Sequence, residues 1–208
     1  MAAALERLVA EIRACRHCVE QPKGRPLPHE PRPVVRVSAT ARLAICSQAP
    51  GVRVHASGVP FSDPSGVRLR EWMGVTAEEF YDERRVAFVP MGFCFPGHDP
   101  HGGDLPPRPE CADLWRRRLF QQLPRLELML LVGQYAQRWH LGDRCGRSVG
   151  DTVRRWRAIF DAPVQPRFLP LPHPSWRNNA WLTTNAWFAT ELLPVLRKEV
   201  RRIMTTAP

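Results

Sequence analysis

The stretch of the chain best suited to chemistry runs from Cys46 to Gly66. It follows a compact apolar segment, Leu43-Ala44-Ile45-Cys46, which breaks at Ser47-Gln48-Ala49-Pro50-Gly51. A short buried strand that ends in a Pro-Gly turn exposes backbone groups at its carboxyl end, where open α/β sheets bind their ligands. We therefore expect the chemistry of this chain to lie here.

Cysteines form a second group of reactive side chains. Cys15 and Cys18 are separated by two residues, a spacing with which a single turn can hold a metal or a cluster. A redox pair and a coincidence of structural cysteines are the alternatives. Cys46 and Cys145 are interpreted as a buried strand cysteine and a loop thiol.

The elements that must position these side chains alternate between strands and helices. Apolar runs predict four strands, at Leu43–Cys46, Val86–Met91, Leu126–Val132 and Arg167–Leu171. Helical spacing predicts helices at Ala2–Ala14, Val67–Met73, a short one after Thr76, Ala112–Leu123, Val149–Phe160 and Trp181–Met204. Strands separated by helices favour a parallel sheet with helices on both faces, within one domain spanning residues 1–208.

Composition limits the classes of partner. The 208 residues carry a formal net charge of +10, which indicates a polyanionic partner unless the basic residues are merely solvated. No apolar run is long enough to span a bilayer, and the start of the chain lacks the pattern of a secretory signal. These features predict a cytoplasmic protein without a membrane anchor, which we expect to be a monomer.

The loop after the first strand resembles the first motif of the uracil-DNA glycosylase superfamily, in which a strand ends in a polar residue, Ala or Asn, Pro and Gly. The match continues without a gap through Gly58, Pro60, Phe61, Ser65 and Gly66, as in the family 4 enzymes. A His-Pro-Ser segment beginning at His173 resembles the second signature of the superfamily. The resemblance implies a three-layer α/β/α fold around the four-stranded, mainly parallel sheet, and an enzyme that acts on DNA.

The resemblance also implies roles for individual residues. Phe61 would stack on the base, and His173 would donate a hydrogen bond to the base oxygen as negative charge develops. A core phenylalanine and a structural histidine are the alternatives. The remaining base contacts would come from Ala49, Met91 and Gly92, and the DNA contacts from Pro50, Gly51, Ser65, Ser175, Trp176 and Arg177. Trp176 has the alternative of packing against Trp181.

Three positions depart from the family 4 pattern. Gln48 stands where family 4 has a glutamate, and a glutamine orients water but cannot accept its proton as a carboxylate does. His55 replaces an acidic residue of the same loop, which makes it the candidate base. Pro90 replaces the asparagine that reads uracil, so backbone groups around Met91 and Gly92, or the Gln48 side chain, would read the base, and hypoxanthine becomes a conceivable substrate.

The spacing of Cys15, Cys18, Cys94 and Cys111 is close to that of the family 4 cysteines that bind a 4Fe-4S cluster. Four thiolates suit a cluster or zinc, and a zinc ribbon would usually bring a second two-cysteine knuckle, so we favour the cluster over zinc or no metal. The interpretation is a glycosylase that hydrolyses the N-glycosidic bond of a deaminated base, most simply uracil, in base excision repair. The rivals are a member that binds nucleic acid without catalysis and a hydrolase of free nucleotides.

Overall fold

The computed structural model describes residues 2–205 and contains one four-stranded sheet. Met1 and residues 206–208, which the predicted 1–208 domain includes, lie outside the described residues. The strands are β1 (Leu43–Cys46), β2 (Val86–Phe88), β3 (Leu128–Val132) and β4 (Arg167–Leu171). They lie in the order β2-β1-β3-β4, and every neighbouring pair is parallel. All four predicted strands are confirmed.

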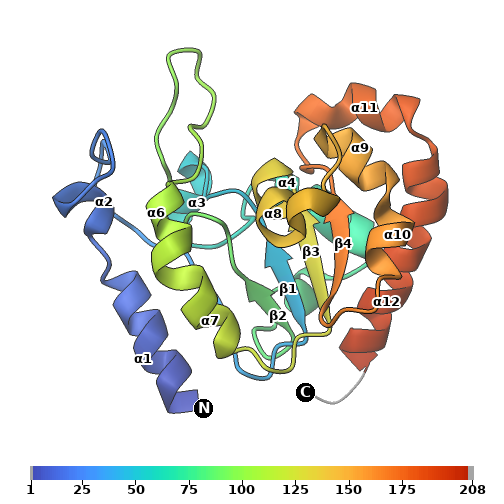
Figure 1. Ribbon diagram of the computed structural model, residues 1–208, viewed down its shortest axis with the longest axis horizontal. Helices are drawn as coiled ribbons and strands as arrows, with labels where there is room; N and C mark the ends of the chain where they lie inside the picture. The colour runs from blue at the N-terminus through green and yellow to red at the C-terminus, as the bar shows by residue number, and fades with distance from the viewer. Residues whose placement is uncertain (1, 206–208) are drawn as a thin grey trace.

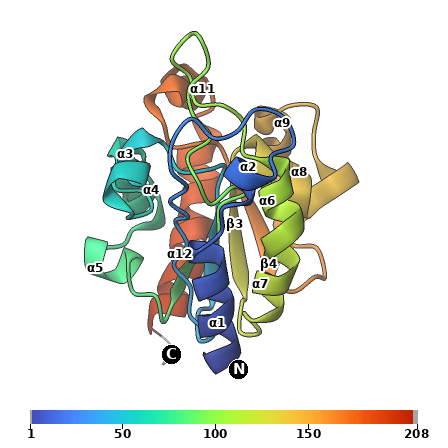
Figure 2. The ribbon, with the colours of Figure 1, turned by 90° about the vertical axis from the view of Figure 1, so that its left-hand side faces the viewer.

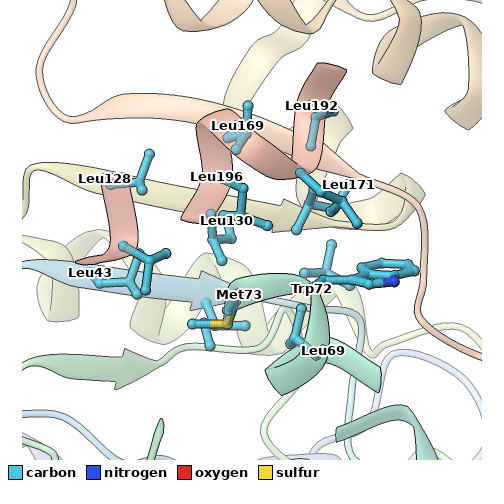
Figure 3. Close-up of a cluster of buried hydrophobic side chains, with 14 of the residues drawn as sticks. Leu43, Leu69, Trp72, Met73, Leu128, Leu130, Leu169, Leu171, Leu192 and Leu196 are labelled. Atoms are coloured by element: carbon cyan, nitrogen blue, oxygen red, sulfur yellow. The ribbon is translucent and has the colours of Figure 1, made fainter. Parts of the chain in front are cut away.

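Successive side chains of a strand alternate between two hydrophobic cores, one on each face of the sheet. Leu43 and Ile45 belong to the first core, whereas Ala44 and Cys46 belong to the second. Because both faces are covered, the strands read as continuous apolar runs instead of alternating patterns. Figure 3 shows the first core, where leucines of the strands meet side chains of the covering helices, including Leu69, Trp72, Met73, Leu192 and Leu196.

Helices cover both faces, so the predicted three-layer α/β/α fold is confirmed. Figure 1 shows α1 and α7 on one side of the sheet and α10 and α12 on the other. The second core receives side chains from α1 (Ala2–Arg13), α6 (Pro109–Cys111), the π-helix η1 (Ala112–Arg116), α7 (Arg117–Gln121) and α8 (Gln134–Leu141). The first receives them from α4 (Pro64–Met73), α5 (Ala77–Phe80), α9 (Val149–Arg154), α10 (Trp156–Phe160), the π-helix η4 (Phe188–Leu192) and α12 (Leu193–Thr205).

Five shorter helices lie in the connections. They are α2 (His17–Glu20), α3 (Val52–Ser57), the 3-10 helices η2 (Gly142–Arg144) and η3 (Trp176–Asn178), and α11 (Asn179–Thr184). The sequence predicts a loop over Val52–Ser57, where the structure forms α3. None of the helices within residues 2–205 combines the length and the apolar character that crossing a bilayer requires.

The helix predicted over Trp181–Met204 is broken in two at Asn185. The buried Asn185 side chain donates to the Trp181 carbonyl (2.7 Å) and accepts from the Arg154 guanidinium (2.9 Å) and the Trp187 indole (3.1 Å). A side chain that satisfies both helix ends and a neighbouring helix stabilises a turn in place of continued helix. The helix predicted over Val149–Phe160 is likewise divided at Arg155.

Candidate active site

A pocket lies where the carboxyl ends of the strands meet. It is lined by the segments that follow β1 (Ser47, Ala49, Pro50, Gly51, Val54), by Pro90 after β2, by His173 after β4, and by Val34, Pro60, Phe61, Asp63, Ser65, Phe88 and Asp104. Its volume of about 90 Å³ holds several water molecules. Because β1 has β2 on one side and β3 on the other, this is the switch point at which parallel α/β sheets bind ligands.

Phe61 is held in the pocket by a strained turn. Its φ of 54° lies in the left-handed region that residues other than glycine rarely adopt. The Tyr81 hydroxyl donates to the Pro60 and Phe61 carbonyls, at 3.0 and 3.2 Å. A Cβ on Gly66 would lie 1.8 Å from the Phe61 carbonyl oxygen, so only glycine fits there. The turn thus explains why Phe61 and Gly66 occur together, and it is the kind of strain that collects at functional sites.

Phe61 serves the core and the pocket at once. Its side chain is 9% exposed and packs edge-to-face against Phe80, with ring centroids 6.2 Å apart. It also belongs to the first hydrophobic core, as the alternative from the sequence expected. The two interpretations are therefore compatible, because the residue belongs to the core and also lines the pocket.

His173 projects into the pocket from the end of β4. Asn178 donates to the His173 carbonyl (2.7 Å), and Arg68 donates to the Ser175 carbonyl (3.0 Å), so two side chains fix the His-Pro-Ser segment. Burial lowers the pKa of His173, and the Asp63 and Asp104 carboxylates oppose this shift. Within residues 2–205 the ring has no hydrogen-bond partner, which leaves its N–H free for a ligand.

Two carboxylates in the pocket were missed by the sequence reasoning. Asp63 caps α4 by accepting from the Gly66 amide (3.3 Å), and Asp104 comes from the loop between Cys94 and Cys111. The signal for Asp63 was its place between Phe61 and Ser65, both already predicted to face the ligand. No local signal marks Asp104, because only the path of its loop brings it to the pocket.

Four of the residues predicted to act in catalysis or to contact the base lie outside the pocket lining. The His55 ring faces His29, with centroids 4.3 Å apart, and burial followed by the charges of His29 and Arg32 lowers the pKa of His55. Gln48 accepts at its backbone carbonyl from the amide of Gly92 (3.0 Å). Met91 packs in the second core. Gly92 lines a different cavity, that of the cysteines. By contrast, Ala49, Pro50, Gly51, Phe61, Ser65 and His173 do come together.

The segment after His173 presents an exposed aromatic side chain. Trp176 is 73% exposed, and the Arg177 guanidinium lies 5.8 Å from the centre of its ring. Trp181 packs against Trp187, with ring centroids 5.8 Å apart, instead of against Trp176. Trp176 and Arg177 are therefore available to a partner outside the chain.

The four cysteines of the predicted cluster line one cavity. Cys15, Cys18, Cys94 and Cys111 all contribute to it, and the Phe93 amide donates to the Cys111 sulfur (3.3 Å). Burial raises the pKa of Cys94 to about 12 and also raises the pKa of Cys111 and of Cys18. Among the described residues, no group of three or more His, Cys, Asp or Glu side chains is arranged to hold a metal ion.

A comparison with protein-family models agrees with this geometry. Residues 35–197 match the model described as "Uracil DNA glycosylase superfamily". The match begins before β1 and ends within α12, so it covers the sheet and every pocket-lining residue except Val34. This match covers more than half of the chain and agrees with the three-layer fold and with the pocket at the strand ends. The chain therefore belongs to the uracil DNA glycosylase superfamily.

Proposed function

We propose that this chain is a DNA glycosylase that hydrolyses the N-glycosidic bond of a deaminated base, with uracil as the first candidate. The observation that carries the proposal is the meeting of Phe61, Asp63 and His173 in one pocket. An aromatic face, a carboxylate and a buried donor are the groups that this reaction requires. Membership of the superfamily supports a glycosylase-type activity.

The base must first leave the stack, because its glycosidic bond is out of reach inside a duplex. Phe61 then offers a face on which the base stacks. As the bond breaks, negative charge moves onto the base, and His173 stabilises it by donating a hydrogen bond to a base oxygen. Because burial lowers its pKa, His173 stays neutral at physiological pH and acts as a donor without giving up its proton.

We assign to Asp63 the role of base that the sequence predicts for His55. Asp63 lines the pocket beside Phe61, and its charge acts on His173. In the proposed reaction Asp63 orients the attacking water and accepts its proton as the bond to C1′ forms. The loss of acidic residues at Gln48 and His55 is therefore no obstacle to catalysis.

We assign the edge of the base to groups other than the Met91 and Gly92 amides. The Met91 and Gly92 amides donate to the carbonyls of Ser47 (2.8 Å) and Gln48 (3.0 Å), so neither is free for a base. Pro90 lines the pocket without a side-chain donor. The hydroxyls of Ser47 and Ser65, which also line it, are the groups we assign to the base edge.

We further propose a 4Fe-4S cluster on Cys15, Cys18, Cys94 and Cys111, as in family 4. The donor set fits: four thiols line one cavity, and a backbone amide points at one sulfur, as amides do around clusters. The cluster is favoured over zinc because the second two-cysteine knuckle usual in a zinc ribbon is absent from the sequence. When bound, the cluster would join three segments of the chain and so stabilise the fold.

The test is base release from labelled oligonucleotides that contain uracil, hypoxanthine or xanthine, under single-turnover conditions. We expect an abasic site to form for one base, with the rate reduced roughly 100-fold or more by Asp63→Asn and at least tenfold by His173→Gln. Asp161→Asn is the matched control. Asp161 is exposed and precedes the amino end of β4, at the opposite end of the sheet from the pocket.

The variants also separate the rival interpretations. His55→Ala tests the role of base expected from the sequence. A loss of rate as large as that of Asp63→Asn would indicate that His55 is the residue that activates the water. If no base is released at any enzyme excess while DNA still binds, the chain is a binding protein of this fold and the proposed activity is wrong.

A further inference from the structure

The loop between Cys94 and Cys111 is braced by its own side chains. The Asp99 carboxylate accepts from the amides of His101 (2.8 Å) and Gly103 (2.9 Å). The Leu105 amide donates to the Gly97 carbonyl (2.9 Å), which closes the base of the loop. Figure 1 shows this loop in light green, rising beyond the end of the sheet where the pocket lies. A braced loop of this kind can hold a side chain in a defined place.

The side chain that it delivers to the pocket is Asp104. Asp104 lines the pocket with Asp63 and His173. One carboxylate oxygen lies 3.3 Å from the position that a Cβ on Gly51 would occupy, so the absence of a side chain there allows the close approach. The other lies 3.3 Å from the His98 Nδ1, and the backbones of His98 and Asp104 also pair. Asp104 thus lies close to Gly51 on one side and to His98 on the other.

Asp104 and Asp63 occupy different depths. Asp104 is 44% exposed and therefore stands at the rim, whereas Asp63 is tied to the start of α4 beside Phe61. In a flipped nucleotide the base enters the pocket and the sugar stays near its mouth. A carboxylate at the rim therefore faces the sugar, not the base.

We propose that Asp104 is a second catalytic carboxylate, whose negative charge stabilises the positive charge that develops on the sugar. The inference rests on the proposed glycosylase function. The C1′–N bond breaks with its electron pair moving to the base, where His173 stabilises the anion. The oxygen of water bonds to C1′, and its proton passes to Asp63. Asp104 takes no proton; it lowers the energy of the oxocarbenium-like sugar between these events.

A merely structural Asp104 would act only through its contact with His98. Asp104→Asn separates the two roles, because the amide oxygen still accepts from His98 while the charge is gone. His98→Gln makes the complementary change, since its amide still donates to Asp104. Charge stabilisation predicts a loss of rate in Asp104→Asn and little change in His98→Gln, whereas a bracing role alone predicts little change in either variant.

The experiment measures affinity for two abasic-site analogues in the same oligonucleotide. One is the neutral tetrahydrofuran, and the other is a pyrrolidine whose cationic nitrogen replaces C1′. We expect the wild type to prefer the cationic analogue, and Asp104→Asn to reduce that preference roughly tenfold while binding the neutral one within about twofold. Asp161→Asn should keep the wild-type preference. Equal preferences in Asp104→Asn and wild type, or no preference in the wild type, would overturn the proposal.

Single-turnover base release separates this inference from the proposed function. If the wild type releases no base, the proposed function fails, and the analogue pair then shows only whether the Asp104 charge favours a cationic sugar analogue. If the wild type releases base and Asp104→Asn is equally fast, the inference alone is wrong. A rate lowered about tenfold, with His98→Gln near the wild type, supports both.

Discussion

At the scale of single residues, the pocket wall depends on a buried cation. The Arg116 side chain is 0% exposed, and its Nη1 donates to the carbonyls of Val89 (2.9 Å) and Pro90 (2.7 Å) at the end of β2. Its Nη2 lies 2.6 Å from the His140 Nε2. A guanidinium only donates, so His140 must accept and must be neutral. Burial, followed by the Arg116 charge, accordingly lowers the pKa of His140 to about 3.

This pair predicts a loss of stability in acid. The unfolded His140 binds a proton near pH 6.5 and the folded one only near pH 3, so the stability contributed at neutral pH is lost as the pH falls through this window. Between pH 7 and pH 4 the loss is roughly 3 kcal/mol of unfolding free energy. Urea denaturation of His140→Gln, whose amide still accepts from Arg116, should show a flatter pH dependence than the wild type.

The control for this measurement is His101→Gln, because His101 is an exposed loop histidine. It should follow the wild-type pH dependence. Parallel curves for His140→Gln and the wild type would contradict the assignment of His140 as the acid-sensitive group.

At the scale of elements, the cysteines connect segments that are distant in sequence. Cys18 lies on α2 and Cys111 on α6, while Cys15 follows α1 and Cys94 follows β2. Figures 1 and 2 both show α2 beside α6. A shared cluster would therefore anchor both ends of the loop that carries Asp104. It would act on the pocket only by fixing the position of this loop.

The cluster proposal predicts a coloured protein. Protein purified anaerobically should be brown, with a broad visible absorption band and bound iron and sulfide, because four thiolates hold the cluster. Cys94→Ser should lose most of the iron and the band. Cys145→Ser should keep them, because Cys145 lies on another cavity. Colourless protein containing zinc, or no metal, would contradict the cluster.

At the scale of the whole molecule, charge and one exposed aromatic favour a nucleic-acid partner. The formal net charge is +10, and Trp176 stands exposed beside the segment that carries His173. Trp139 is also exposed, at 45%, but it lines a groove with Gln165 and Pro166, which precede the amino end of β4. The two tryptophans therefore lie at opposite ends of the sheet.

This arrangement predicts salt-sensitive DNA binding that depends on Trp176. Affinity should fall roughly 10- to 100-fold between 50 and 200 mM salt, because bound phosphates release counterions. Trp176→Ala should weaken binding by about 1–3 kcal/mol, the magnitude of base–aromatic stacking. Trp139→Ala should bind as the wild type does. Weak affinity for DNA that does not change with salt concentration would instead favour a hydrolase of free nucleotides.

The sequence by itself determined the elements whose cause is local. The four strands are uninterrupted apolar runs, and α5 begins at Thr76, where the predicted cap forms a full capping box with Glu79. The sequence also marks the glycines and the aromatic residue of the first motif, because the turn at Phe61 tolerates no side chain on Gly66.

Only the tertiary structure decided which side chains share the pocket. His55 and Gln48 stand in the expected loop, but α3 turns His55 toward His29 and leaves the pocket to Asp63 and Asp104. The break at Asn185 depends on Arg154, a contact between distant segments. The physical reason is common to all these cases. Periodicity and caps act within a few residues, whereas the direction in which a side chain points depends on loops that pack only once the sheet has formed.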